Sequence, residues 1–382
     1  MITAKRSGAE YRSIRVNRTI PLLGVLVLMA GCGAPLNGAR NSTPTASPRA
    51  SAAASPTASP SASSASVCAR AASYGLLITS DSLNLISPRG CVGATVPLRA
   101  ASVPSCVNGP QAVVPPPVSA SDDKVYYRDG DTQIRFIAPD GTSGAVTSVP
   151  GGTARVSFFS VTPDDRRIAV LAEDFTPATM IEWRLYVEDL RGGHRIDLSS
   201  GTIHKSESDT TMWPVGWHQG QLVVAVVPAC SPAPIYHPAA WRVLDASTGA
   251  EVARIDTGSC YSRLIPSPAG VLCFDAVNLD SRRYDWSGNM TSHQGQPFQS
   301  LKESPQLSPS GEDYFLDRDG DWWAQVWSGG SGMRTPIKGR PACQWINDTA
   351  IMSPDSVIAY PSAAVTALGL VGECAGRLPG GL

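Results

Sequence analysis

From residue 67 onward, short runs of apolar, β-branched and aromatic residues alternate with clusters of Gly, Pro, Asp and Ser. Within many runs apolar and polar side chains alternate with a period of two, as in LLITSDSLNLI (76–86) and VYYRDGDTQIRFI (125–137). No stretch beyond the first 32 residues keeps a 3.6-residue apolar period over three turns. Period-two alternation bounded by turn residues is typical of strands, so the sequence predicts an all-β protein.

The strand runs form an internal repeat of three strands, preceded in most copies by a further short segment that ends in a turn. The units that can be aligned span residues 76–98, 125–150, 167–198, 221–255, 270–295, 314–337 and 349–372. Four strands per unit predict a β-propeller of about seven four-stranded blades over residues 67–382, because such sheets bury both apolar faces only against neighbouring blades. The first and last units are the weakest, as expected where both chain ends close the ring. Six or eight blades, or a sandwich of two sheets, are the alternatives.

Two segments carry a motif as well as a pattern. FFSVTPDDRRIAVLAED (158–174) and PQLSPSGEDYFLD (305–317) resemble the WD40-like repeat of TolB-type bacterial propellers, in which an aromatic residue, Ser-Pro-Asp-Gly and a hydrophobic strand follow one another. Asp165 stands where that repeat usually has Gly, and Ser310-Gly311 replaces Asp-Gly. The resemblance implies propeller architecture and does not extend to an activity.

The N-terminus has the organisation of an export signal. Basic residues precede the apolar run IPLLGVLVLMA (20–30), which is shorter than the roughly 20 residues that a membrane-spanning helix needs. The following LMAGCGAP (28–35) resembles the bacterial lipobox. The resemblance implies that residues 1–31 are a signal peptide and that Cys32 is lipidated, which would anchor the mature protein in the bilayer on the extracytoplasmic side of the cell membrane. An ordinary signal peptide with an incidental cysteine is the alternative.

Residues 33–66 consist almost only of Ala, Ser, Thr, Pro, Gly, Asn and Arg, which is too little apolar bulk for a packed core. Together with Cys32 they are predicted to form a disordered tether, residues 32–66. Treated as a flexible coil, this tether spans on the order of 30 Å. It would lift the folded domain away from the lipid headgroups.

The chain has nine cysteines, eight of them beyond Cys32. An even number in an exported chain favours disulfides, and none of the eight has a spacing typical of a zinc site. We expect Cys230 to pair with Cys260 and Cys343 with Cys374, because each pair brackets one repeat. The spacing leaves the other connectivities open.

Charge excludes one class of partner. The 31 basic and 32 acidic residues nearly cancel, and no dense Lys/Arg run follows the N-terminus. Nucleic acid is therefore not an expected partner, since binding it requires a basic surface.

The stretch DRDGD (317–321) places aspartates at positions 1, 3 and 5 of a calcium loop. Such a loop also needs Gly at position 6 and Glu at position 12, where this chain has Trp322 and Ser328. RDGD recurs at 128–131, in the equivalent hairpin of another unit, and Asp-Gly favours hairpin turns. We therefore predict a turn and no metal site.

Catalytic signatures are lacking. There is no G-x-S-x-G or H-E-x-x-H, and the five histidines are scattered. VLDASTGAEVARI (243–255) resembles the repeat of quinone-dependent propellers in a single unit. The sequence predicts neither catalytic residues nor a cofactor.

Three long insertions, residues 173–182, 199–213 and 228–240, belong to connections that open on the same propeller face. Long loops gathered on one face often carry function. The hypothesis is a non-catalytic binding or scaffold module for a cell-envelope protein, peptide or glycan. Its alternative is a propeller enzyme of the envelope: a hydrolase, a lyase or a quinone-dependent oxidoreductase. The candidate binding residues are Trp213, Trp217, Tyr236, His237, Asp319 and Asp321.

Overall fold

The computed structural model describes residues 71–106, 111–231, 237–258, 260–275, 278, 280–295, 305–318, 321–326, 334–337 and 342–382. Of residues 294–295, 316–318, 321–326 and 334–337 it describes the backbone only. The predicted signal peptide (1–31) and tether (32–66), and with them Cys32, lie outside the described residues. So do Tyr236 and Asp319.

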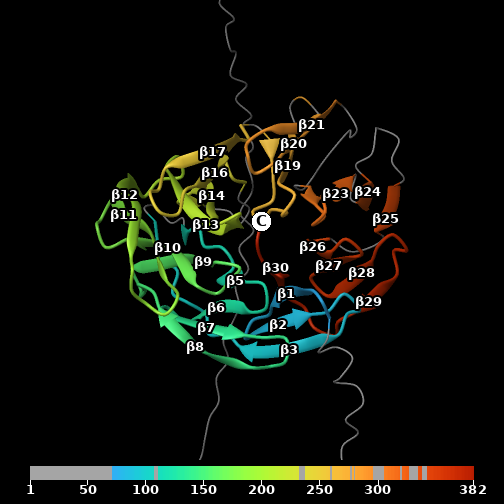
Figure 1. Cartoon of the computed structure of the whole chain (residues 1–382), viewed down its shortest axis with the longest axis horizontal. Coiled ribbons are helices and arrows are strands. Elements are labelled where there is room, and N and C mark those ends of the chain that lie inside the picture. Colours follow the sequence, from blue (N-terminus) through green and yellow to red (C-terminus); the bar gives the residue numbers. More distant parts are fainter. Residues whose placement is uncertain are drawn as a thin grey trace, which may run out of the picture. The chain divides into compact units, whose positions relative to one another are not determined.

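The described residues form seven four-stranded antiparallel sheets, numbered here in chain order (Figure 1). Sheet 1 contains β1 (Tyr74–Ile78), β2 (Ser82–Ile86), β3 (Val92–Pro97) and β30 (Glu373–Leu378); sheet 2 contains β5 (Val118–Ala120), β6 (Val125–Asp129), β7 (Gln133–Ile137) and β8 (Ser143–Ser148). Sheet 3 contains β9 (Arg155–Val161), β10 (Arg167–Asp174), β11 (Met180–Asp189) and β12 (Ile196–His204); sheet 4 contains β13 (Thr210–His218), β14 (Gln221–Pro228), β16 (Ala240–Leu244) and β17 (Glu251–Asp256).

The remaining sheets have the same order of strands. Sheet 5 contains β18 (Cys260–Tyr261), β19 (Val271–Asp275), β20 (Asp280–Tyr284) and β21 (Met290–Gly295); sheet 6 contains β22 (Gln306–Leu307), β23 (Asp313–Arg318), β24 (Asp321–Val326) and β25 (Arg334–Ile337). Sheet 7 contains β26 (Gln344–Asn347), β27 (Ala350–Ser353), β28 (Ser356–Ala359) and β29 (Val365–Ala367). A two-stranded sheet pairs β4 (Gln111–Ala112) with β15 (Cys230–Ser231).

The sheets follow one another around a centre as the blades of a propeller (Figure 1). The innermost strand β30 contacts β5, β5 contacts β9 and β9 contacts β13, while on its other side β30 contacts β26. Strand β30 also pairs with β1, from Tyr74 opposite Leu378 to Ile78 opposite Glu373. Residues from both ends of the domain therefore share one sheet. The all-β propeller class predicted from the repeats is confirmed, and the two-sheet sandwich is not the fold.

Burial explains why inner and outer strands differ in sequence. In the second strand β14 (QLVVAVVP), the six residues Leu222–Val227 are all buried, because neighbouring sheets cover both of its faces. The outermost strand β12 (IDLSSGTIH) has no buried residue, and its side chains are mainly polar. Apolar runs thus mark strands between two sheets, and polar sequences mark the rim.

The turns between first and second strands share a backbone conformation. In three of them the fourth residue donates its backbone N–H to the first residue at 3.0 Å, and that fourth residue is Asp165, Gly270 or Gly311. Each has positive φ, of 60°, 116° and 77°. Asp tolerates this region better than most residues. Asp165 also pairs with Lys124 in the corresponding turn of sheet 2.

Three disulfides join described residues: Cys106–Cys230, Cys260–Cys273 and Cys343–Cys374. The expected Cys230–Cys260 pair is wrong, because each of these cysteines bonds to another partner. The expected Cys343–Cys374 pair is present. The Cys106–Cys230 bond spans 124 residues and lies next to the β4–β15 pair. Cys106 and Cys230 therefore come close because a segment distant in sequence crosses between sheets. Looking for cysteine pairs that bracket one repeat does not predict such a bond.

Two of the predicted long loops are in fact strands. Segments 173–182 and 199–213 belong largely to β10, β11, β12 and β13, which leaves connections of only residues 175–179 and 205–209. These segments were predicted as loops because they are rich in polar residues. An exposed strand at the edge of a sheet has the same polar composition as a loop. Among the described residues, no helix is long and apolar enough to span a membrane.

A glycine substitution tests the turn conformation. At Gly270 a Cβ atom would lie 1.9 Å from the carbonyl oxygen of Tyr284, whereas at Gly141, which also has positive φ, nothing lies within 4 Å. Gly141→Ala is expected to cost about 1 kcal/mol of folding free energy, from the backbone conformation alone. Gly270→Ala is expected to cost about 1–3 kcal/mol more, from the steric clash. Thermal unfolding of both variants measures the difference, and equal losses would contradict the turn geometry.

Candidate functional site

The centre of the propeller contains a cavity of about 120 Å³. Its wall is formed by residues of the innermost strands β5, β9, β13 and β30 and by residues 264–266. Residues 380–382 also line it, and these lie near the middle of the ring (Figure 1). They are held there by backbone hydrogen bonds from Gly380 to Ser121 (2.7 Å) and from Leu382 to Trp217 (2.8 Å).

A second segment borders the cavity. The strap (residues 111–117) begins in β4, which pairs with β15 between the second and third strands of sheet 4, and continues into β5 of sheet 2. Val113 is 1% exposed and donates its backbone N–H to Ala229 at 3.1 Å. Residues 115–117 are three prolines that line the cavity. The Cys106–Cys230 disulfide lies beside the β4–β15 pairing, because Cys230 belongs to β15.

The cavity lining is cationic. It includes Arg128 and Arg377, and none of its described residues is Asp or Glu. Arg128 is 3% exposed, and one Nη donates to the carbonyl of Ser157, while its Nε has no partner among the described residues. Arg377 donates to the carbonyl of Gly381 at 3.2 Å. Burial lowers the pKa of Arg128, and it lowers the pKa of Arg377 to about 10. Both guanidinium groups remain charged at neutral pH.

The candidate binding residues Trp213 and Trp217 lie in β13 and line this cavity, but as buried residues. Trp213 is fully buried and its ring packs 5.3 Å from that of Phe158, and Trp217 is 2% exposed and donates its Nε1–H to Ser160 O at 3.3 Å. Their rings therefore contribute mainly to packing between sheets 3 and 4.

The other predicted residues are scattered. His237 is partly buried and packs on Tyr261 at 4.5 Å, and burial lowers the pKa of its imidazole. Asp321 begins β24 and its backbone lies opposite Arg318, at the end of β23, in the second and third strands of sheet 6. His237 is not among the described residues that line the central cavity. Within the described residues, no group of three His, Cys, Asp or Glu side chains has a geometry suited to a metal ion.

A polar groove of about 570 Å³ lies on sheet 3. The turns of sheets 2 and 3 are level, because Asp122 N donates to Pro163 O at 3.0 Å. From these turns β10 runs for eight residues and β6 for five, so sheet 3 projects about 10 Å further on the opposite face. The projecting strand ends carry the groove, whose lining includes Arg155, Ala172, Asp174, Glu182, Arg184, Ser200 and Thr202.

The groove presents both charges. Arg155 Nε donates to Asp174 at 2.7 Å, and Arg184 Nη2 donates to Asp197 at 2.6 Å. The arginine side chains are 60% and 53% exposed, and Glu182 is exposed as well, so these groups are accessible to a partner. Ion pairs this exposed contribute only about 0–1 kcal/mol to stability, so exchanging them for contacts with a partner costs little.

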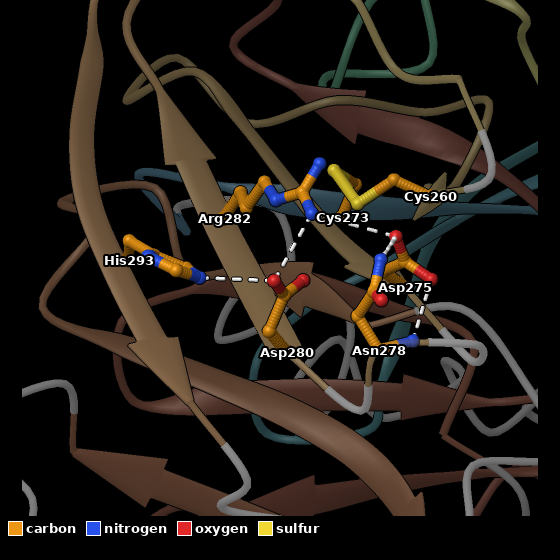
Figure 2. A network of polar contacts seen from close by, with 7 residues as sticks. All are labelled: Cys260, Cys273, Asp275, Asn278, Asp280, Arg282 and His293. Carbon is orange, nitrogen blue, oxygen red and sulfur yellow. Dashed lines mark hydrogen bonds and ion pairs between the residues drawn. A yellow bond between two sulfur atoms is a disulfide. The ribbon is translucent and has the colours of Figure 1, made fainter. Parts of the chain in front are cut away.

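A third polar cluster lies on the outer strands of sheet 5 (Figure 2). Asp280 Oδ2 accepts hydrogen bonds from Arg282 Nη2 (3.0 Å) and from His293 Nε2 (2.9 Å). A carboxylate beside a histidine is an arrangement that acid–base catalysis uses. None of the three residues lines the central cavity.

The neighbouring Asp275 completes this cluster. It is 1% exposed and accepts hydrogen bonds from the backbone N (3.1 Å) and Nδ2 (2.8 Å) of Asn278, and Arg282 Nη2 lies 3.4 Å away. The Cys260–Cys273 disulfide lies beside it, with Cys260 opposite Asp275 in the strand pairing (Figure 2). The polar groups pair mainly with one another, so the arrangement braces the β19–β20 connection.

Comparisons with known proteins assign no family to the chain. No protein-family model matches the chain, and no curated protein sequence matches it. Solved structures similar to it include TolB from Agrobacterium tumefaciens, with 12% identity over 67% of this chain and 81% of that chain and a TM-score of 0.36. An oligogalacturonate lyase in complex with manganese has 10% identity over 64% of this chain and 72% of that chain and a TM-score of 0.42. Likeness at these identities concerns the fold alone. The protein is a β-propeller with TolB-like structural neighbours.

Glu173, which is among the residues that line the groove, gives a pH-dependent prediction. It is 2% exposed, and Thr211 Oγ1 donates to its carboxylate at 2.5 Å. Burial raises its pKa from 4.5 to about 7. Between these values the folded state holds a proton that the unfolded state has lost, so stability falls as the pH rises from 5 to 8, by on the order of 3 kcal/mol at most.

Glu173→Gln keeps an acceptor for Thr211 and removes the charge. We expect it to raise the melting temperature at pH 8 and to change it little at pH 5, whereas Glu182→Gln, on the exposed surface of the same sheet, should have a small effect at both. Calorimetry at the two pH values measures this. A gain of equal size at pH 5 and pH 8 would contradict a raised pKa.

Proposed function

We propose that the protein is a membrane-anchored extracytoplasmic lipoprotein whose β-propeller is a non-catalytic binding module for another component of the cell envelope, a protein, peptide or glycan. The lipid anchor rests on the sequence around Cys32. The binding role rests on the polar groove of sheet 3, which is the observation that carries the proposal.

The strands that form the groove are longer than a blade of this propeller needs, and this additional length supports a role in binding. Five residues in β6 suffice for sheet 2, whereas β10 has eight. The additional length exposes one face of a regular four-stranded sheet instead of burying it. Side chains on regular strands are held in fixed positions, which lowers the entropy lost when a partner binds. Exposed arginine, carboxylate and hydroxyl groups there suit hydrogen bonding to a polar partner.

The titratable groups elsewhere favour this role over catalysis. The Asp280–His293 pair is also engaged with Arg282, so Asp280 Oδ2 is already shared between two donors. Acid–base work requires a group within reach of a bound substrate, and this cluster lies away from the groove and from the cavity lining. A binding module is therefore the function that the geometry supports best.

The anchor is tested first. Mass spectrometry of the mature protein is expected to find residue 32 as its N-terminus, carrying a diacylglyceryl group. Cys32→Ser should shift the protein from the membrane pellet to the soluble fraction or leave the signal uncleaved, since two acyl chains are what makes anchoring stable. An unmodified Cys32 at the N-terminus of a membrane-bound protein would overturn the lipoprotein assignment.

The groove is tested by photo-crosslinking in intact cells. A photoreactive residue at Glu182 is expected to give discrete adducts, and the same residue at Arg166 is the control, because the Arg166 side chain is 82% exposed on the opposite face. Arg184→Glu should weaken partner binding by about tenfold and deplete the adducts. Identical adduct patterns at positions 182 and 166, or adducts that Arg184→Glu leaves unchanged, would argue against the groove.

A further inference from the structure

We propose that the central cavity is a binding site for a small doubly charged oxyanion, a phosphate or a short dicarboxylate, held between Arg128 and Arg377. The proposal does not rest on the groove or on the lipid anchor. It concerns a different surface of the propeller, and its outcome is independent of theirs.

The position of Arg128 is the first observation. It lies in β6 (VYYRD), where the three preceding residues are at most 3% exposed, and its own exposure is 3%. Alternation along the strand places it on the same face as Tyr126, toward sheet 3, where it reaches the carbonyl of Ser157 at the cavity wall. A buried guanidinium is costly unless its charge is compensated and its donors are satisfied.

The second observation is the missing compensation. Among the described residues Arg128 forms no ion pair, and its buried Nε has no hydrogen-bond partner. The nearest carboxylate that influences its pKa is Asp131, whose effect is smaller than that of burial. Asp131 accepts hydrogen bonds from Ser102 instead, with a 2.7 Å contact to the backbone N–H. Arg128 thus has an unsatisfied donor and an uncompensated charge at a cavity.

A second cation lines the same cavity. Arg377 comes from β30, the strand that closes sheet 1, and it donates a hydrogen bond to the carbonyl of Gly381. The other described lining side chains are apolar, glycine, proline or serine, so no lining side chain is a carboxylate. Asp348 raises the pKa of Arg377, but its effect is smaller than that of burial. Other arginines in the described part of the chain, such as Arg99 and Arg155, form ion pairs with aspartates. Arg128 and Arg377 differ from them, because neither has a carboxylate within ion-pair distance among the described residues.

Size and chemistry define the ligand. A cavity of about 150 Å³ holds a molecule of six heavy atoms, so the 120 Å³ here suits a ligand of about that size. Inorganic phosphate has five heavy atoms and malonate has seven, so both are close to this size. Two guanidinium groups match a doubly charged oxyanion through charge-assisted hydrogen bonds. Buried arginine is well suited to this role because its planar donors remain charged when desolvated.

Isothermal titration of the full chain with inorganic phosphate and, separately, with malonate tests the proposal. One site per chain is expected for at least one of these probes, in a buffer whose chloride concentration keeps the ionic strength constant. Arg128→Met and Arg377→Gln should each weaken binding at least about tenfold. Arg166→Gln, which removes an exposed arginine that does not line the cavity, should bind as the wild type does.

Thermal unfolding separates binding from general salt effects. Phosphate stabilises many proteins by exclusion from their surface, in a non-saturating way that a cavity variant would share. Specific binding instead saturates, and it is lost in Arg128→Met. That variant should fold, because it removes a buried uncompensated charge, and its melting temperature without phosphate should equal or exceed that of the wild type. No saturable binding of either probe, or equal affinity in Arg128→Met, would overturn the proposal.

Discussion

The structure depends on one constraint, that a four-stranded sheet with two apolar faces is stable only between two others. Strands such as β14, buried along six consecutive residues, have no solvent-compatible face, so the series of sheets must continue until the first meets the last. The pairing of β30 with β1 meets this condition, because it places strands from both ends of the domain in one sheet. Residues 380–382 follow β30 directly into the centre, so closure of the ring also determines what lines the cavity.

The closed ring also limits where the length of the strands can vary. The turns between first and second strands are joined to their neighbours, through Asp122 with Pro163 and Ser267 with Ser308, and this fixes their level. Longer strands therefore project only on the opposite face. The groove of sheet 3 arises in this way. The strap and the Cys106–Cys230 disulfide belong to connections of the same face.

The sequence predicted what depends on local patterns. Period-two alternation placed the strands, and the repeat motif placed the turns between first and second strands, in which Asp165 and Gly311 have positive φ. It did not predict contacts between distant segments. Cys106 meets Cys230 only because the strap crosses between sheets, and β12 was assigned partly to a loop because an exposed outer strand has the same polar composition as a loop.

Arg128 shows why the candidate site was missed and what would have revealed it. It was interpreted as part of the RDGD hairpin, in which arginine is unremarkable on an exposed turn. Its position is still within the strand, after three residues that both neighbouring sheets bury, and an arginine there must be buried as well. Replacing such a residue by an apolar one is often stabilising, so an arginine that is buried without a carboxylate partner lowers stability unless something else compensates its charge. That cost is difficult to explain by folding alone and is readily explained by a ligand, because binding converts an unpaired buried charge into a satisfied one.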